Sequence, residues 1–445
     1  MKSESALAVR DAGTPGAMLL SATLVGAPTE RAGGGDRQTV GGVRPIRILV
    51  FSSLYPNAVM PRHGVFVEER LRHLVGSGRV SATVVAPVPW FPFRNPRFGT
   101  YAEFAQVPAR EQRHGIDILH PRYPLIPKIG MSIAPSLMYR ALLPVLRKQV
   151  ASEAFDLIDA HYFYPDGVVA AKLGAALGKP VVITARGSDL NVIPRHRLPR
   201  RQIKMTAVRV AAVIAVSEAL KRKAEALGIE SGRISVLRNG VDLERFRPLD
   251  RSTIRTRLGL VGVVWLAVGN LVELKGVHVT LGALAKVPDA ILLVAGDGPE
   301  ASRLRQLASE LGVKARVRFL GNVPHAHLLE YYNAADVLML ASSREGMPNV
   351  VLESFACGTS VVVAPFAGAE ELISAPEAGE IAKARTAEGM LAAWHELWNR
   401  KPDRAATRRF AESLGWGPVV EAQCALYAKV LAARDQPSAP GKQND

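Results

Sequence analysis

Apolar and polar positions alternate along most of this chain in two rhythms. Short runs rich in Val, Ile and Leu, bounded by turn residues, indicate buried strands, whereas apolar side chains repeating every three or four positions indicate helices. The runs predict strands at 46–51, 80–87, 118–123, 156–160, 180–185, 211–216, 234–238, 263–269, 290–295, 316–320, 336–341 and 360–364. The helical patterns predict helices at 133–150, 167–177, 199–208, 217–227, 350–357, 386–399, 403–414 and 416–432.

Strands that alternate with helices across short loops are typical of a parallel, doubly wound sheet. The sequence therefore predicts an α/β protein with two domains of similar design, residues 44–250 and 251–415. Residues 247–257, which begin with Arg-Pro, are interpreted as the linker between them. A last helix, 416–434, is expected to return and pack on the first domain.

Composition places the chain among globular proteins. Hydrophobic residues make up 48% of the 445 positions, and Cys357 and Cys424 are the two cysteines. This low number of cysteines argues against a disulfide framework and fits a reducing compartment. We therefore expect a cytoplasmic protein. No apolar run reaches the roughly 18 residues that span a bilayer, and the patch at 17–26 lacks the cleavage site of a signal peptide. Residues 1–43 and 435–445 are predicted to be disordered tails.

Two carboxylates lie on either side of the turn that follows the predicted strand 336–341. Glu345 is on the loop and Glu353 is near the start of the next helix, which Gly358 ends. In an open parallel sheet, ligands bind at the carboxyl ends of strands, where helix amides favour phosphate. The loop can therefore offer amides to a diphosphate and carboxylates to hydroxyls. The alternative is that Glu353 only complements the helix dipole and Glu345 is a solvated charge.

Other polar residues follow other predicted strands. Lys275 lies at the entry of a helix, where its ammonium can share a diphosphate with helix amides. Gly64, which opens a helix ending near Val75, permits a close approach of backbone to phosphate or sugar, or is an ordinary turn glycine. His161 and Arg186 stand in loops after strands of the first half. A single loop histidine is more often structural than functional.

The combination of motifs resembles glycosyltransferase family 4, the group 1 glycosyl transferases. The matching segments are Glu345-x7-Glu353, Gly269 to Gly276 with Lys275, Gly296-Asp-Gly-Pro-Glu300, Leu320-Gly-Asn-Val323, Val216-Ser-Glu218 and Asn239-Gly-Val-Asp242. Each motif is weak alone and specific only in combination, and the resemblance as a whole covers about residues 46–432. Tyr55-Pro56 with His63 to Phe66 further resembles bacterial cell-surface polysaccharide transferases, including the teichuronic-acid type.

The resemblance implies the GT-B fold, with two Rossmann-like domains across a cleft, and retaining transfer without a metal. The donor is then a nucleotide-sugar, UDP before GDP, and the acceptor a glycan or a lipid-linked molecule. By the same resemblance Glu353 binds ribose hydroxyls, Glu345 binds donor-sugar hydroxyls, and Lys275 neutralises the leaving diphosphate. Further implied contacts are the backbone of the Pro348, Asn349 and Val350 turn at the diphosphate, Gly64 near the diphosphate and His161 against the transferring sugar.

One position departs from the family pattern. Asn270 stands where the family usually places an arginine that adds a second cation to the diphosphate. Arg186 stands where the family often has a histidine. Our hypothesis is that Arg186 points into the same cleft and partly replaces the missing guanidinium.

Three other functions compete with glycosyl transfer. A sugar-nucleotide 2-epimerase of the same fold is disfavoured by the spacing of Glu345 and Glu353, whereas Asn270 leaves room for a non-catalytic sugar-nucleotide binder or scaffold. The net charge of +16 favours acidic partners, but no aromatic-lined basic motif supports RNA binding, so no nucleic acid is expected. The amphipathic segment 128–150 and the basic cluster 195–204 predict peripheral contact with an anionic membrane, or else a packed helix and a solvated face.

Overall fold

The computed structural model describes residues 44–125, 130–152 and 154–435. The predicted tails lie outside the described residues, apart from residue 435, where the last helix ends. The two cysteines are buried and free, in agreement with the absence of a disulfide expected from the sequence. None of the described helices combines the length and apolar composition that crossing a bilayer requires.

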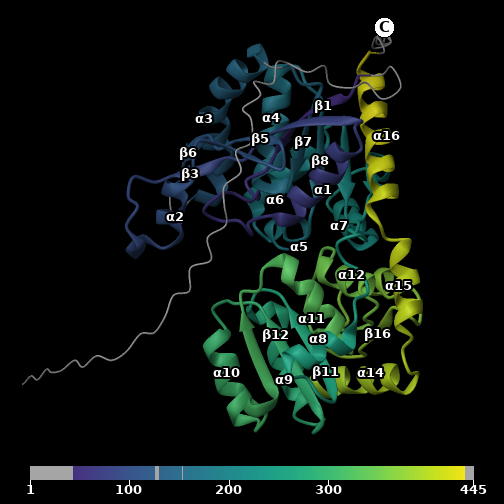
Figure 1. The fold of residues 1–445 in the computed structure, drawn as a ribbon. Coiled ribbons are helices and arrows are strands. Elements are labelled where there is room, and N and C mark those ends of the chain that lie inside the picture. Colours follow the sequence, from purple (N-terminus) through teal and green to yellow (C-terminus); the bar gives the residue numbers. More distant parts are fainter. Residues whose placement is uncertain (1–43, 126–129, 153, 436–445) are drawn as a thin grey trace, which may run out of the picture. The chain divides into compact units, whose positions relative to one another are not determined.

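The first half of the chain forms an eight-stranded sheet (Figure 1). Its order is β10-β9-β8-β7-β1-β2-β5-β4, and every neighbouring pair is parallel except the β4–β5 hairpin at one edge. The strands are β1 (Ile46–Phe51), β2 (Val80–Val85), β4 (Arg110–Arg113), β5 (Ile116–Leu119), β7 (Leu157–His161), β8 (Val181–Ala185), β9 (Ala212–Ala215) and β10 (Ile234–Val236). The parallel α/β prediction is confirmed for this half.

Helices cover both faces of this sheet. They are α1 (Val65–Gly76), α2 (Thr100–Gln106), α3 (Gly130–Ser152), α4 (Val168–Leu177), α5 (Ser188–Asn191), α6 (Arg197–Ala207) and α7 (Glu218–Ala226). Along β1, Leu49 and Phe51 join the core beneath α3, α4 and α6, whereas Ile48 and Val50 join the core beneath α1. Because side chains of a strand alternate between faces, a stretch of strand that is buried on both sides must be apolar at every position, as residues 48–51 of β1 are.

The second half forms a six-stranded sheet of the order β13-β12-β11-β14-β15-β16, parallel throughout. Its strands are β11 (Val263–Val268), β12 (Ala290–Ala295), β13 (Val317–Gly321), β14 (Val337–Leu340), β15 (Val361–Val363) and β16 (Gly379–Ile381). Its helices are α8 (Arg251–Leu258), α9 (Val277–Leu284), α10 (Ala301–Glu310), α11 (Leu328–Ala334), α12 (Asn349–Ala356), α13 (Ala369–Leu372), α14 (Ala387–Asn399) and α15 (Arg404–Glu412). The two-domain α/β prediction is thereby confirmed.

Two sequence interpretations were wrong. Residues 118–123 do not form one strand, because the strand is interrupted at Pro121. β5 ends before this proline, and β6 (Arg122–Pro124) pairs with β3 (Val88–Trp90) in a separate small sheet. The stretch 247–257 is not simply a linker, since α8 occupies most of it. This short helix has a single buried apolar residue, Ile254, so its periodicity is weak, and the carboxylate of Asp250 caps it instead.

The strand orders place the ligand crevices. In the first sheet β1 lies between β2 and β7, and in the second β11 lies between β12 and β14. The chain therefore continues from β1 and from its neighbour β7 towards opposite edges of the first sheet, and it does the same from β11 and β14 in the second. Loops that diverge in this way leave a crevice at the carboxyl ends of the strands. The polar loops singled out from the sequence follow β1, β7, β8, β11 and β14, which are the strands at or beside these crevices.

The C-terminal helix α16 (Trp416–Asp435) packs on the first sheet although it follows the second (Figure 1). Its Val420, Cys424, Tyr427 and Val430 belong to the core beneath α1. Tyr427 also donates a 2.7 Å hydrogen bond to buried Asp159 of β7. A helix from the end of the chain therefore completes the core of the first domain.

Asp166 links two loops of the first sheet. Its Oδ2 accepts hydrogen bonds from Ser53 N at 2.8 Å and Ser53 Oγ at 2.9 Å, while Oδ1 is buried without a partner among the described residues. Burial, the largest influence, raises the pKa of Asp166 from 3.8 to about 7. In the folded protein this carboxyl therefore remains protonated over a pH range in which the unfolded chain has released the proton.

This difference predicts a pH dependence of stability. From about pH 4 to about pH 7 the folded state binds more protons than the unfolded state at Asp166, so stability falls as pH rises through that window. Asp166→Asn, which stays neutral, should reduce the fall by roughly 1–3 kcal/mol. Urea unfolding at about pH 5 and about pH 8 measures it. Asp289→Asn, on the surface, is the control of equal charge, and an unchanged slope in Asp166→Asn would refute the assignment.

Candidate functional site

The loops after β11 and β14 meet through an ion pair. Lys275 Nζ lies 2.6 Å from Glu345 Oε1, and both side chains are largely buried. Gly276 makes this approach possible, because its φ is +69° and a Cβ there would lie 2.0 Å from the carbonyl oxygen of Ala341 at the end of β14. The pair therefore joins two strands that are neighbours in the sheet but far apart in sequence.

Helix α12 begins beside this ion pair. It starts at Asn349, directly after Pro348, and no side chain among the described residues caps its first turn. The first-turn amides of a helix have no partner within the helix, so those of Asn349 and Val350 are available to an anion. The helix ends before Gly358, whose φ of +74° confirms the predicted left-handed stop.

Glu353 lies on α12 and is 7% exposed. One carboxylate oxygen accepts a hydrogen bond from His325 Nε2 at 2.8 Å, and the other accepts one from Tyr332 Oη at 2.7 Å. Burial, together with Glu353, holds the pKa of Tyr332 well above its usual value, so this hydroxyl remains a donor. Two donors from α11 and the turn before it thus fix the orientation of the carboxylate.

The two glutamates line two adjoining hollows. One, of about 660 Å³, is lined by Glu353, Asn270 and His325, and the other, of about 420 Å³, by Glu345, Lys275 and Arg186. Both are lined by Phe66, Asn349 and Val350. The start of α12 therefore lies at the seam, with one carboxylate on each side of it.

Gly64 starts helix α1 on the side of the first domain. Its φ is +75°, and a Cβ there would lie 2.2 Å from the carbonyl oxygen of Leu54, so any side chain would separate α1 from the loop after β1. Gly64 is buried and lines neither hollow, whereas the next two residues, Val65 and Phe66, line the hollow of Glu353. The glycine brings the start of α1 to the site rather than lining it.

His161 and Arg186 form a buried pair at the ends of β7 and β8. Arg186 donates from Nη2 to His161 Nδ1 at 2.7 Å and from Nη1 to Asn239 Oδ1 at 3.0 Å. Because a guanidinium only donates, His161 Nδ1 must accept, so its proton is on Nε2. That nitrogen lies 3.2 Å from Asp159 Oδ2, and the carboxylate accepts the proton's hydrogen bond.

This arrangement occupies both nitrogens of His161. The residue is 2% exposed and lines neither hollow, whereas Arg186 lines the hollow of Glu345. Burial lowers the pKa of His161, and it lowers the pKa of Arg186 to about 9. The Arg186 guanidinium also lies over the ring of Phe66, with Cζ 5.3 Å from the ring centroid. In this structure His161 does not line the site, and it can influence a ligand only indirectly, by holding Arg186 in place.

The loops of the two sheets touch at the site. Asn239 Nδ2 donates to Asn349 Oδ1 at 2.8 Å, which connects the arginine pair to the start of α12. Gly346 also lies against the backbone of Arg186, because a Cβ at this position would lie 2.0 Å from the carbonyl oxygen of Arg186. These contacts hold Arg186 beside the Glu345 loop.

Asn270 is exposed and lines the hollow of Glu353, not the one that Arg186 lines. Another cation reaches its hollow: Arg62, from the loop before α1, donates to Asn322 Oδ1, and both residues line it. The structure thus offers guanidinium groups on both sides of the seam, among them Arg186 on one side and Arg62 on the other.

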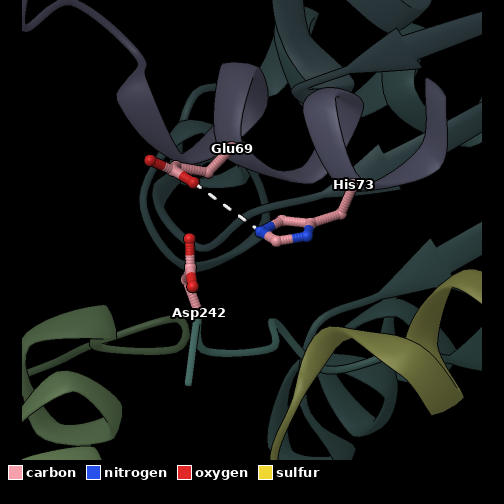
Figure 2. Close-up of side chains that lie close together, drawn as sticks. All are labelled: Glu69, His73 and Asp242. Atoms are coloured by element: carbon pink, nitrogen blue, oxygen red, sulfur yellow. Dashed lines mark ion pairs between the residues drawn. The ribbon is translucent and has the colours of Figure 1, made fainter. Parts of the chain in front are cut away.

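Glu69, His73 and Asp242 gather at the edge of the site, with ligand atoms within 4.8 Å of one another. Figure 2 shows the first two on α1, pointing towards Asp242 on the chain below. Three such ligands can hold a divalent cation. Glu69, however, already pairs through Oε1 with Arg245 at 2.9 Å and Arg72 at 3.4 Å, which supplies positive charge there.

Several contributors to the site are absent from the sequence-based prediction. Tyr332 and His325 hold Glu353, Asn239 holds Arg186, and Phe66 lies against the guanidinium of Arg186. Asn239 lies in the Asn-Gly-Val-Asp segment and Phe66 lies in the segment from His63 to Phe66, so the motifs were a signal for these two residues but not for Tyr332 or His325.

Comparison with known proteins now identifies the family. The family described as Glycosyl transferases group 1 matches residues 258–413, and Glycosyltransferase Family 4 matches residues 121–245. The glycosyltransferase TuaC of Bacillus subtilis, named for teichuronic acid biosynthesis, is 33% identical over 346 residues, which are 74% of this chain and 83% of TuaC. The chain belongs to the group 1 glycosyltransferases. It is therefore an enzyme of the glycosyltransferase class, as its motifs predict.

Other relatives agree with this assignment. The D-inositol 3-phosphate glycosyltransferase of Geodermatophilus obscurus is 30% identical over 366 residues, 75% of this chain and 81% of that protein. Among solved structures, sucrose-phosphate synthase of Thermosynechococcus elongatus superimposes with a TM-score of 0.71 over 88% of this chain and all of the other, at 19% identity. Anabaena HepE in complex with UDP gives 0.66 over 87% and 100%, at 20% identity. The GT-B fold of this glycosyltransferase is thereby confirmed.

The position of Arg186 gives a prediction about turnover. Arg186→Lys keeps a charge but not the fork that donates to His161 and Asn239 together. Loss of a preorganised donor typically lowers kcat about 10²- to 10³-fold. Expressed as free energies, the rise of the activation barrier should therefore exceed the fall in the free energy of unfolding. Steady-state kinetics and urea unfolding measure the two. Arg344→Lys, exposed in the same hollow, is the matched control, and wild-type kcat in Arg186→Lys would contradict the role.

Proposed function

We propose that this glycosyltransferase moves a sugar from a nucleoside diphosphate sugar to a glycan or lipid-linked acceptor, with retention and without a metal ion. UDP is the first choice of nucleotide and GDP the second. The observation that carries the proposal is the pair of hollows joined at the start of α12, with Glu353 in one and the Lys275–Glu345 pair in the other.

The shape of the site suits the parts of such a donor. The nucleoside occupies the hollow of Glu353, whose carboxylate oxygens keep lone pairs free for ribose hydroxyls after accepting from His325 and Tyr332. The diphosphate lies at the seam, against the amides of Asn349 and Val350. The sugar occupies the hollow of Glu345. Support for a uridine nucleotide comes from HepE, a protein of the same fold solved with UDP and with UDP-glucose.

The ion pair between Lys275 and Glu345 can contact both parts of the donor, the leaving diphosphate and the transferring sugar. An ammonium has three N–H donors, so Lys275 can keep its 2.6 Å contact with Glu345 and also donate to a diphosphate oxygen. The carboxylate of Glu345 then accepts from sugar hydroxyls on its other side. Positive charge fixed beside the diphosphate stabilises the charge that develops as the bond from the anomeric carbon breaks.

Retention follows from transfer on one face of the sugar. The bond between the anomeric carbon and the diphosphate oxygen breaks, the acceptor oxygen bonds to that carbon on the same face, and its proton passes to the leaving phosphate oxygen. Glu345 is tied to Lys275 and is assigned to hydroxyl binding, so it is not the nucleophile. His161 holds Arg186, whose guanidinium lines the hollow of Glu345 and adds positive charge on the side of the diphosphate that faces the sugar.

The biological setting is proposed from relatives. TuaC is named for teichuronic acid biosynthesis, and the motifs near Gly64 resemble those of cell-surface polysaccharide transferases. We propose the same class of process here, in the cytoplasm, where the two free, buried cysteines would stay reduced. No role with nucleic acid is proposed.

Glu353→Gln tests the donor site. A ligand at 100 times its Kd stabilises its protein by about 2.7 kcal/mol, so wild-type protein should melt at higher temperature with UDP. In Glu353→Gln one of the oxygens becomes an NH₂ group that cannot accept, and the shift should be largely lost. Thermal unfolding with UDP, GDP and their common sugars measures this.

Glu370→Gln, an exposed change of equal charge, should keep the UDP shift. If GDP raised the melting temperature and UDP did not, GDP would replace UDP as the proposed donor nucleotide. Binding of a nucleotide-sugar with no turnover across a range of acceptors would favour the non-catalytic reading that Asn270 suggests. Turnover of UDP-N-acetylglucosamine without any acceptor would favour the epimerase.

Metal removal tests the electrostatics. If Lys275, Arg186 and the α12 amides neutralise the diphosphate, EDTA should leave the transfer rate within about twofold, and the product should keep the anomeric configuration of the donor. Transfer assays with and without EDTA and Mn²⁺, with proton NMR of the product, measure both. A rate lost in EDTA and restored by Mn²⁺ would overturn metal independence and direct attention to Glu69, His73 and Asp242.

A further inference from the structure

A third hollow lies away from the strand ends that carry the site. It has a volume of about 1140 Å³ and is enclosed by α3, α4 and α6, which pack on one another on one face of the first sheet (Figure 1). Val181 and Ala211 in its wall stand at the amino-terminal ends of β8 and β9, whereas the donor site is at the carboxyl ends. No residue lines both this hollow and those of the donor site.

The lining of this hollow carries charge of a single sign. None of its described lining residues is Asp or Glu, and six are cations: Arg140, Lys172, Lys179, Arg201, Arg209 and Arg233. Arg140, Arg201 and Arg209 are exposed, and no described carboxylate is within ion-pair distance of them. Cations without carboxylate partners around one concave space leave a positive potential that attracts an anion.

Exposed apolar side chains stand beside these cations. Leu198 is 55% exposed and Met205 45%, both on α6 and both lining the hollow, and Val208 just after α6 is 65% exposed. The opposite side of α6 buries Ile203 and Ala207 in the core. The exposed side of this helix is therefore a mixture of arginine and aliphatic side chains that the fold itself does not cover.

That mixture discriminates between classes of anionic partner. Nucleic-acid sites pair cations with aromatic rings that stack on bases, but the exposed side chains here are aliphatic. A free phosphate needs the cations and gains nothing from Leu198 or Met205. The interface of an anionic bilayer uses both, because phosphate groups pair with arginine and aliphatic side chains enter the layer beneath them.

We propose that α6 and this hollow dock the protein on an anionic membrane, with a lipid phosphate entering the hollow between Arg201 and Arg209. Leu198, Met205 and Val208 then enter the interfacial layer. The proposal places the predicted peripheral contact at one surface, and it does not rest on the proposed glycosyl transfer.

Vesicle sedimentation of the full chain tests the docking surface. The wild-type protein should bind vesicles of phosphatidylcholine with phosphatidylglycerol several-fold more tightly than phosphatidylcholine alone, and salt should weaken the binding. Arg201→Glu with Arg209→Glu should lower binding at least tenfold. Arg257→Glu with Arg303→Glu, the same charge change on exposed arginines of the second domain, should stay within about twofold of wild type.

A second pair of variants separates a membrane from a soluble anion. Leu198→Ser with Met205→Ser keeps every charge and should still lower vesicle binding several-fold. The melting temperature and the UDP shift of each variant, expected to match wild type, show that the fold and the donor site are intact. A failure of donor binding with vesicle binding intact would sink only the glycosyl-transfer proposal.

Three results would overturn the docking proposal. One is equal binding to neutral and anionic vesicles, and another is equal loss in the charge-reversal pair and its second-domain control. The third is binding of inorganic phosphate or a short RNA that Arg201→Glu with Arg209→Glu abolishes, while vesicles are not bound. That outcome would assign the hollow to a soluble anion.

Discussion

The carboxyl ends of parallel strands lie at one edge of a sheet, and the site of this glycosyltransferase depends on that constraint. Residues as distant in sequence as Lys275 and Glu345 become neighbours because β11 and β14 are adjacent strands with the same direction. The same constraint brings together His161 and Arg186, at the ends of β7 and β8, so that Arg186 Nη2 lies 2.7 Å from His161 Nδ1.

The polar groups of the site are held by other polar groups rather than by packing alone. Glu353 is fixed by Tyr332 and His325, and Arg186 by His161 and Asn239. Buried groups of this kind need partners, since an unpaired one costs stability. The consequence is a set of side chains with defined orientation before any ligand arrives, which is the condition for electrostatic stabilisation of a transition state.

The first domain has two different environments, which lie near opposite ends of the strands of its sheet. At the carboxyl ends of its strands, Arg186 and Phe66 face the donor hollows. Near the amino-terminal ends, cations and exposed aliphatic side chains surround a hollow without described carboxylates. Part of the chain's positive charge is therefore concentrated on one surface of this domain.

The sequence by itself determined the alternation of strands and helices, the two sheets and the loops that carry Lys275, Glu345 and Glu353, because these follow from local periodicity, turn residues and motif spacing. It did not reveal α8, whose one buried apolar residue leaves no period, or the break at Pro121. Only the tertiary structure decided that His161 lines neither hollow and is held between Asp159 and Arg186. Which side chain reaches a cavity depends on partners such as Asp159 and Asn239, which meet through strand order and not through spacing along the chain.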